Sequence, residues 1–217
     1  MDVTELVLVR HGETEWHAEN RYAGRSDVAL TALGEAQADD LAGWAAGAGL
    51  DAVLTSPLSR ARRTAGPAAT AAGLDVVVDR RLVEVDFGTA EGLTRDEMRA
   101  RFPDELSAFL AAPASCPLPG GERGTDAVAR ARPALDAACR SWPAGRVLVV
   151  AHQTLLRLLL CDLVGLPLDH YRAVFPALDP AARTVVVPAA TGPAALRSLN
   201  AAGPAGSPPS EEPRWRR

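Results

Sequence analysis

The alternation of short apolar runs with longer amphipathic stretches is the feature that most constrains how this 217-residue chain can fold. Apolar runs of strand length lie at residues 6–9, 52–54, 75–78 and 146–150. Helical patterns lie between and after them, at about residues 31–47, 58–72, 94–112, 122–140 and from residue 153 onward. Such alternation is typical of a parallel sheet wound with helices on its faces. The predicted fold class is therefore α/β, a three-layer α/β/α sandwich around a mostly parallel sheet.

Local signals add detail to this prediction. Thr31 is a candidate N-cap for a helix whose buried stripe would hold Leu33, Leu41, Trp44 and Ala48. The pattern at residues 94–112 is predicted as one or two short helices, broken at Pro103. Residues 184–187 and 195–199 are predicted as edge strands, which gives the sheet an antiparallel edge.

The chain is predicted to be a single domain over residues 1–200, because no repeat or second domain is apparent. Residues 201–217 are Gly, Pro, Ser, Glu and Arg for the most part, a composition that cannot bury a core. This segment is therefore predicted to be a disordered tail.

Composition excludes several classes of function. All 23 basic residues are arginine, so the lysine amine of a Schiff-base enzyme or a P-loop nucleotidase is missing. The net charge of −4 argues against binding to nucleic acid. Three widely spaced cysteines, Cys116, Cys139 and Cys161, indicate buried thiols rather than a disulfide framework. Neither a signal peptide nor a membrane span is expected, which predicts a cytoplasmic protein.

Polar side chains follow three of the predicted strands. Arg10 and His11 follow the first, Arg60 lies shortly after the second, and His152 follows the fourth. Ligands of open α/β sheets bind at the carboxyl ends of the strands, where helix N-termini also point. Two guanidinium groups and two imidazoles at one edge predict an anion site, and a tetrahedral phosphate suits them best.

Each of these residues has a plainer interpretation when it is taken alone. A histidine after a strand is more often structural, and arginines on a helix usually form a solvated face. Glu84 is a carboxylate that lies near these groups in the sequence, and it could be an exposed residue or a capping partner. The joint placement of four such groups at the strand ends favours function.

The ordered motifs of the chain resemble the histidine phosphatase superfamily, the phosphoglycerate-mutase-like proteins. The resemblance covers about residues 3–200 and rests on the blocks Leu8-Val9-Arg10-His11-Gly12-Glu13-Thr14-Glu15-Trp16, Gly24-Arg25-Ser26-Asp27, Ser56-Pro57-Leu58-Ser59-Arg60-Ala61, Glu84-Val85-Asp86-Phe87-Gly88, Pro119-Gly120-Gly121-Glu122 and Val149-Val150-Ala151-His152.

The resemblance implies the chemistry of the site. His11 would be the nucleophile that forms a phosphohistidine, with its other ring N–H bound to the carbonyl of Gly12. Arg10, Arg60 and a protonated His152 would surround the phosphoryl oxygens, and Glu84 would be the general acid and base. No metal or other cofactor is required, because arginines supply the positive charge. A zinc site at His11, Glu13 and His17 is a weak alternative, since they straddle a strand-to-loop junction.

Substrate contacts are expected from a further set of residues. They are His17, Arg21, Tyr22, Ala23, Gly24 and Gln153. His17 stands where the family commonly has Asn and could instead face solvent, while Gln153 stands where Gly is most frequent. Arg21, Arg25, Arg95 and Arg99 could select a second anionic group, or could simply lie on helix surfaces.

The expected partner is a small-molecule phosphate ester, and the identity of the ester and the oligomeric state are left open. The run at residues 84–88 and the short connection between Gly92 and Glu122 resemble the phosphatase branch rather than the mutases, which carry an inserted basic segment. A phosphoglycerate mutase and a non-catalytic phospholigand-binding relative are the alternatives.

Overall fold

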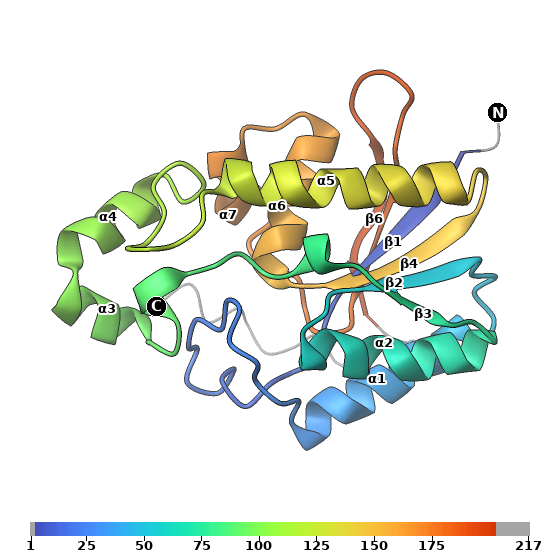
Figure 1. The fold of residues 1–217 in the computed structure, drawn as a ribbon, viewed down its shortest axis with the longest axis horizontal. Coiled ribbons are helices and arrows are strands. Elements are labelled where there is room, and N and C mark those ends of the chain that lie inside the picture. Colours follow the sequence, from blue (N-terminus) through green and yellow to red (C-terminus); the bar gives the residue numbers. More distant parts are fainter. Residues whose placement is uncertain (1–2, 203–217) are drawn as a thin grey trace.

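A six-stranded sheet forms the centre of the computed structural model, which describes residues 3–202 (Figure 1). The strand order across the sheet is β3-β2-β4-β1-β5-β6. The strands are β1 (Glu5–Arg10), β2 (Ala52–Thr55), β3 (Val76–Val78), β4 (Arg146–Ala151), β5 (Arg183–Val187) and β6 (Ala195–Ala201). The predicted α/β class with a mostly parallel sheet is confirmed.

The pairing of the strands explains where their ends meet. β4 lies between β1 and β2 and is parallel to both, with Leu8 opposite Val149 and Leu54 opposite the same residue. The carboxyl ends of these three strands therefore lie at one edge of the sheet. β5 is antiparallel to β1, and β6 is antiparallel to β5.

One of the two predicted edge strands does not lie at an edge. Residues 184–187 belong to β5, which lies between β1 and β6, whereas the edge strand predicted at residues 195–199 is confirmed as β6. β3, within the run at residues 75–78, forms the opposite edge, where Val77 and Val78 are exposed. Apolarity alone does not separate a buried strand from an edge strand, because valine also fits the pleated, half-buried surface of an edge strand.

Helices cover both faces of the sheet (Figure 1). On one face, α1 (Ala32–Ala45) and α2 (Ser59–Ala72) pack against Val7, Val9 and Val150. On the other face, α5 (Gly124–Ser141) and α6 (Gln153–Val164) pack against Leu6 and Leu8. Alternate residues of β1 thus enter different cores, as the period of two in a strand requires.

Smaller helices complete the chain. α3 (Arg95–Arg101) and α4 (Pro103–Ala111) project to one side of the layers (Figure 1), and α7 (Tyr171–Val174) follows α6. Thr94 and Glu97 form a capping box at α3, and Pro103 begins α4, as a proline without an N–H can. Three single-turn helices are η1 (Arg80–Leu82), η2 (Gly88–Ala90) and η3 (Leu168–His170).

Several local predictions need correction. Thr31 does cap α1, but Leu33 is 54% exposed and lies outside its buried stripe. Cys161 is buried, whereas Cys116 and Cys139 are only half-buried, and all three are free. Ala201 ends β6 instead of beginning a tail. The rest of the predicted tail, residues 203–217, lies outside the described residues.

Within residues 3–202, no helix combines the length and the apolarity that crossing a membrane requires.

Candidate active site

Five side chains converge where β1, β2 and β4 end. Arg10 ends β1 and His11 follows it, Arg60 lies in the first turn of α2, and His152 is the N-cap of α6. Glu84 joins them from the loop after η1, by binding the N-terminus of α6. The structure therefore brings together all five residues that the sequence predicted as the chemical centre.

The His11 ring is held in one tautomer. Nδ1 lies 2.7 Å from the carbonyl oxygen of Gly12, which can only accept, so the ring proton is on Nδ1. Nε2 then carries the lone pair and accepts a hydrogen bond of 3.2 Å from Arg60 Nε. Burial lowers the pKa of His11 well below 6.5, and the positive charges of Arg10 and Arg60 add to this effect. The ring is therefore neutral and nucleophilic at neutral pH.

The backbone beneath His11 is fixed by close packing. Gly12 N donates to Thr64 Oγ1 on α2 at 2.9 Å. A Cβ atom at Gly12 would lie 2.5 Å from the carbonyl oxygen of Gly34 near the start of α1. The close contact with Gly34 requires glycine at position 12. α1 and α2 together therefore fix the backbone that carries the His11 ring.

Arg60 is 1% exposed and has no carboxylate partner among residues 3–202. Its terminal nitrogens donate to the carbonyl oxygens of Ser26 and Gly24, each at 2.7 Å. Burial lowers the pKa of this guanidinium, and the charge of Glu84 partly offsets the effect. Two neutral carbonyls orient the cation but leave its charge largely uncompensated, which suits it to an anionic ligand.

His152 is fully buried and close to His11, with ring centroids 5.2 Å apart. Nε2 lies 2.6 Å from Ser56 Oγ, while Nδ1 has no partner among the described residues. Burial and the charges of nearby arginines lower the pKa of His152 well below 6.5, so the ring is neutral in this structure, while the protonated ring is predicted for a site that holds a phosphate. A neutral ring that accepts from the Ser56 hydroxyl still offers an Nδ1–H donor.

Arg10 is oriented by α6 and by the loop before β5. One terminal nitrogen donates to Gln153 Oε1 at 2.6 Å and to the Leu178 carbonyl oxygen at 2.9 Å. The other contacts His17 Nε2, and the buried Nε has no partner among residues 3–202. Burial lowers the pKa of Arg10 to about 10, which leaves it charged at neutral pH.

Glu84 sits against the N-terminus of α6. One carboxylate oxygen accepts hydrogen bonds from the backbone N–H groups of Val85 at 2.8 Å and Leu155 at 2.9 Å. The other oxygen accepts from Thr154 N at 3.0 Å. Burial raises the pKa of this carboxyl even though these donors and Arg60 favour its ionised form. The carboxyl is thus poised to release and take up a proton nearer neutrality than a free glutamate.

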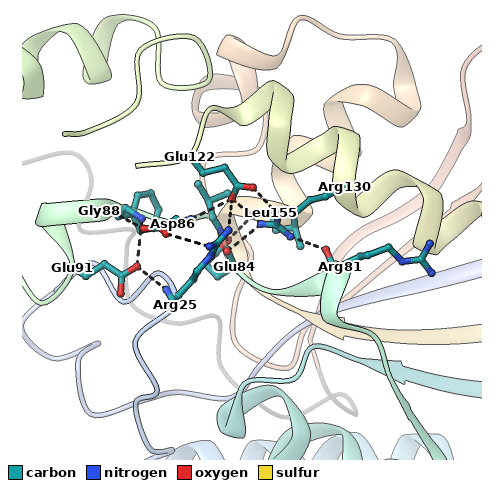
Figure 2. Close-up of polar contacts among 11 residues, drawn as sticks. Arg25, Arg81, Glu84, Asp86, Gly88, Glu91, Glu122, Arg130 and Leu155 are labelled. Atoms are coloured by element: carbon teal, nitrogen blue, oxygen red, sulfur yellow. Dashed lines mark hydrogen bonds and ion pairs between the residues drawn. The ribbon is translucent and has the colours of Figure 1, made fainter. Parts of the chain in front are cut away.

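Arg130 on α5 holds the segment that carries Glu84, and sequence reasoning missed this residue (Figure 2). Its guanidinium forms a bidentate ion pair with the Glu122 carboxylate, with N···O distances of 2.7 and 2.9 Å. It also donates to the carbonyl oxygens of Glu84 at 3.1 Å and Arg81 at 2.7 Å. The only available signal was its spacing of eight residues from Glu122 in the Pro-Gly-Gly-Glu motif.

The same region ties the loop of residues 21–26 to the Glu84 segment (Figure 2). Arg25 pairs with Asp86 at 3.3 Å and with Glu122 at 3.6 Å. Glu91 accepts hydrogen bonds from the backbone N–H groups of Arg25 and Ser26. Gly24 has a positive φ of 48°, and a Cβ there would overlap the Glu91 carboxylate. The loop that orients Arg60 is therefore itself held by carboxylates.

Of the residues predicted to contact substrate, some contact Arg10 beside His11, whereas the others contact other parts of the chain. His17 and Gln153 contact Arg10, and the His17 ring centroid lies 6.1 Å from that of His11. Burial lowers the pKa of His17 to about 3. The Gly24 carbonyl oxygen accepts a hydrogen bond from Arg60. The Ala23 carbonyl oxygen accepts a turn hydrogen bond from Ser26 N, and Tyr22 packs against aromatic rings. Arg21 is committed elsewhere, because it pairs with Glu19 and Glu97.

The zinc alternative does not fit this arrangement. The Glu13 carboxylate accepts a hydrogen bond from Thr31 Oγ1 at the N-cap of α1. Residues 3–202 contain no group of three or more His, Cys, Asp or Glu side chains placed to hold a metal ion.

Comparison with known proteins identifies the class to which this fold and site belong. The model of the family described as "Histidine phosphatase superfamily (branch 1)" matches residues 6–201, so the chain belongs to this superfamily. Among solved structures, "Mycobacterial hydrolase 1" is 30% identical with a TM-score of 0.85, over 92% of this chain and 99% of that one. A mycobacterial glucosyl-3-phosphoglycerate phosphatase, Rv2419c, is 30% identical with a TM-score of 0.82, over 91% and 99% of the two chains.

Curated relatives include both larger and similar-sized proteins. The bifunctional protein Rv2228c of Mycobacterium tuberculosis is 43% identical over 72% of this chain, but the match spans only 43% of that protein. The chain thus covers less than half the length of that relative. A probable phosphoglycerate mutase, GpmB of Erwinia tasmaniensis, is 38% identical over 77% of this chain and 78% of its own length.

Proposed function

We propose that this protein is a metal-independent phosphatase that hydrolyses small-molecule phosphate monoesters through a phosphohistidine at His11. The observation that carries the proposal is the state of that ring: Nδ1–H is bound to the Gly12 carbonyl, and the Nε2 lone pair faces Arg60 Nε at 3.2 Å. A nucleophile held in one tautomer beside an uncompensated cation fits attack on an anionic phosphorus centre.

The first half-reaction transfers the phosphoryl group to the protein. Nε2 of His11 attacks phosphorus, the bond between phosphorus and the ester oxygen breaks, and the Glu84 carboxyl gives its proton to the departing alkoxide. In the second half-reaction Glu84 takes a proton from water, the resulting hydroxide attacks phosphorus, and the P–N bond breaks. Inorganic phosphate leaves and the neutral ring returns.

The charge of the transferred group is balanced by donors that are already oriented. Arg10 Nε and His152 Nδ1 are buried without partners among residues 3–202, and Arg60 lies against His11 Nε2. Catalysis of phosphoryl transfer rests mostly on positioning and on electrostatic stabilisation of such oxygens. Two guanidinium groups can fill the role that a divalent cation has in other phosphoryl-transfer enzymes.

Hydrolysis is preferred over mutase chemistry for two reasons. The phosphatase structure named above covers 91% of this chain, and the connection between Gly92 and Glu122 contains only the short helices α3 and α4 and a loop. A mutase must keep water from the phosphohistidine, which a short connection does poorly. The mutase alternative is kept because of the 38% identity to a probable phosphoglycerate mutase.

The test is release of inorganic phosphate from p-nitrophenyl phosphate and from a panel of metabolite esters, with a chelator present. Turnover by the wild-type protein, its loss in His11→Ala, and a phosphoenzyme that survives alkali but not acid support the proposal. Phosphoglycerate isomer appearing faster than inorganic phosphate identifies a mutase. Tight ester binding without phosphate release identifies a binding protein.

A further inference from the structure

The arginines that the sequence suggested for a second anionic group are mostly committed to carboxylates of the chain. Arg21 pairs with Glu19 and Glu97, Arg25 with Asp86 and Glu122, and Arg99 with Asp96, while Arg95 is exposed. Two other arginines, Arg157 and Arg172, have no ion pair with any carboxylate among residues 3–202. They are therefore better candidates for binding an anion.

Arg157 is the more unusual of the two, because it is buried and has no ion-pair partner in the described part of the chain. Only 4% of the residue is exposed, and its Nε has no hydrogen-bond partner among the described residues. The guanidinium carbon lies 4.8 Å from the centroid of the Tyr171 ring. A ring face compensates a buried cation only in part, so the charge is available to a ligand.

Arg157 also lies on α6, the helix whose N-terminal residues bind Arg10 and Glu84. It follows Gln153 by four residues and Thr154 by three on α6, and these two residues bind Arg10 and Glu84. Residues at these spacings share one helix face, and side chains lean toward the N-terminus of their helix. The guanidinium is thereby directed toward the end of α6 where the phosphoryl site lies.

Arg172 on α7 also lies against aromatic residues. Both of its terminal nitrogens lie 3.5 Å from the Tyr22 hydroxyl, and its guanidinium carbon lies 5.4 Å from the Phe109 ring centroid. Tyr22 itself packs against Phe87 with ring centroids 5.0 Å apart. Tyr22 thus connects Arg172 to the segment that follows Glu84.

The cations of this region are not paired with carboxylates. Arg10, Arg60, Arg157 and Arg172 form no ion pair within residues 3–202, although the charges of Glu84, Asp179, Asp27 and Glu91 act on Arg10 and Arg60 from a greater distance. A phosphate at the centre would contact Arg10 and Arg60 and leave Arg157 and Arg172 without a paired anion. Cations that are removed from water and left unbalanced are costly, so a ligand with further negative charge is favoured.

We propose that Arg157, Arg172 and the Tyr22 hydroxyl form a subsite for a second anionic group, a carboxylate or a second phosphate, on the alcohol portion of the substrate. This inference rests on the proposed phosphatase function and narrows its substrate class. The preferred esters are those whose leaving alcohol is itself an anion, because guanidinium forks bind such groups through paired charge-assisted hydrogen bonds.

The experiment compares esters that differ only in the second group. 3-Phosphoglycerate and glycerol 3-phosphate differ by a carboxylate, and fructose 1,6-bisphosphate and fructose 6-phosphate differ by a phosphate. We expect the wild-type kcat/KM to be at least about 10-fold higher for one or both of the anionic members, as one charge-assisted contact allows. The pair with the larger ratio identifies the group.

Three variants assign that preference to residues. Arg157→Met, Arg172→Gln and Tyr22→Phe should lower the ratio of kcat/KM for the preferred anionic ester to kcat/KM for its neutral partner, toward a ratio of one. Arg99→Gln, an exposed arginine paired with Asp96, is the matched control and should keep the preference. The conservative Tyr22→Phe and Arg172→Gln variants keep the test valid if Arg157→Met does not fold.

The subsite proposal is overturned if the wild-type protein prefers neither anionic ester, or if the variants slow both members of a pair equally. Its failure is separable from failure of the proposed function. If no ester is hydrolysed, the Kd values of 3-phosphoglycerate and glycerol 3-phosphate are measured by calorimetry on the same proteins. A preference that disappears in Arg157→Met and Arg172→Gln would support the subsite even then, and equal Kd values would refute it.

Discussion

Arg60 Nε donates a 3.2 Å hydrogen bond to Nε2 of His11, the atom that carries the lone pair of the ring. This contact places the Arg60 guanidinium beside the atom that an incoming phosphoryl group must approach. The charge of Arg60 also helps to lower the pKa of His11, an effect that is due first to burial and to which the charge of Arg10 also contributes. The same guanidinium can therefore keep the nucleophile neutral and attract its target.

Arg60→Ala should lower kcat by about 10²–10³, the usual cost of removing one oriented donor to the transferred group. It should also raise the pKa of His11 relative to the wild-type protein, because one nearby positive charge is lost. Phosphate release and an NMR titration of the ring measure the two effects. Arg62→Ala, an exposed arginine on the same helix, is the control and should change neither. An unchanged rate in Arg60→Ala would exclude it from the phosphoryl site.

Glu84→Gln should remove the proton donor and lower kcat by about 10²–10⁴ for alkyl phosphates. The loss should be smaller for p-nitrophenyl phosphate, because that leaving group needs little protonation. Burial raises the pKa of Glu84, so the wild-type rate of the first half-reaction should fall as pH rises through that raised value. This alkaline limb should be absent from the pH profile of Glu84→Gln, and its persistence would assign the acid to another group.

His17→Asn should make the protein less sensitive to acid. Burial lowers the pKa of His17 to about 3, whereas an unfolded histidine has a pKa of about 6.5. The unfolded state therefore binds a proton first as pH falls below about 6.5, and the free energy of unfolding decreases. This group accounts for about 1 kcal/mol of that decrease between pH 7 and about pH 5.5. Urea unfolding at the two pH values measures it, and an equal decrease in the variant would contradict the assignment.

Arg130→Met should lower kcat without a comparable change in KM, because Arg130 positions the Glu84 segment without lying against the predicted phosphoryl site. The pair with Glu122 and the bonds to the Glu84 and Arg81 carbonyls would all be lost. We also expect the alkaline limb of the pH profile to move, which a purely structural role elsewhere would not produce.

The control for this change lies two residues further along α5. Arg132 pairs with Asp136 and Asp162 and has no contact with the Glu84 segment among those observed. Arg132→Met should therefore leave both kcat and the pH profile as in the wild-type protein. Equal effects of the two substitutions would show that α5 acts only through its stability.

Much of the fold could be predicted from local pattern. β1 and β4 are continuous apolar runs flanked by polar residues, and Thr31 and Pro103 mark helix starts by their own chemistry. From the sequence alone, the strand-end rule also predicts Arg10, His11, Arg60 and His152 at one edge of the sheet. The edge position of β3 and the internal position of β5 could not be read in this way, because strand order depends on pairings between distant segments.

The sequence by itself determined the class of fold and the identity of the five chemical groups, since periodicity, strand ends and motif order are properties of neighbouring residues. Only the tertiary structure decided which arginines keep an uncompensated charge. Arg60 is buried while Arg62 on the same helix is exposed, and within residues 3–202 Arg157 lacks a carboxylate partner where Arg21 has two. Burial and pairing depend on which segments cover each helix face, and those segments come from distant parts of the chain.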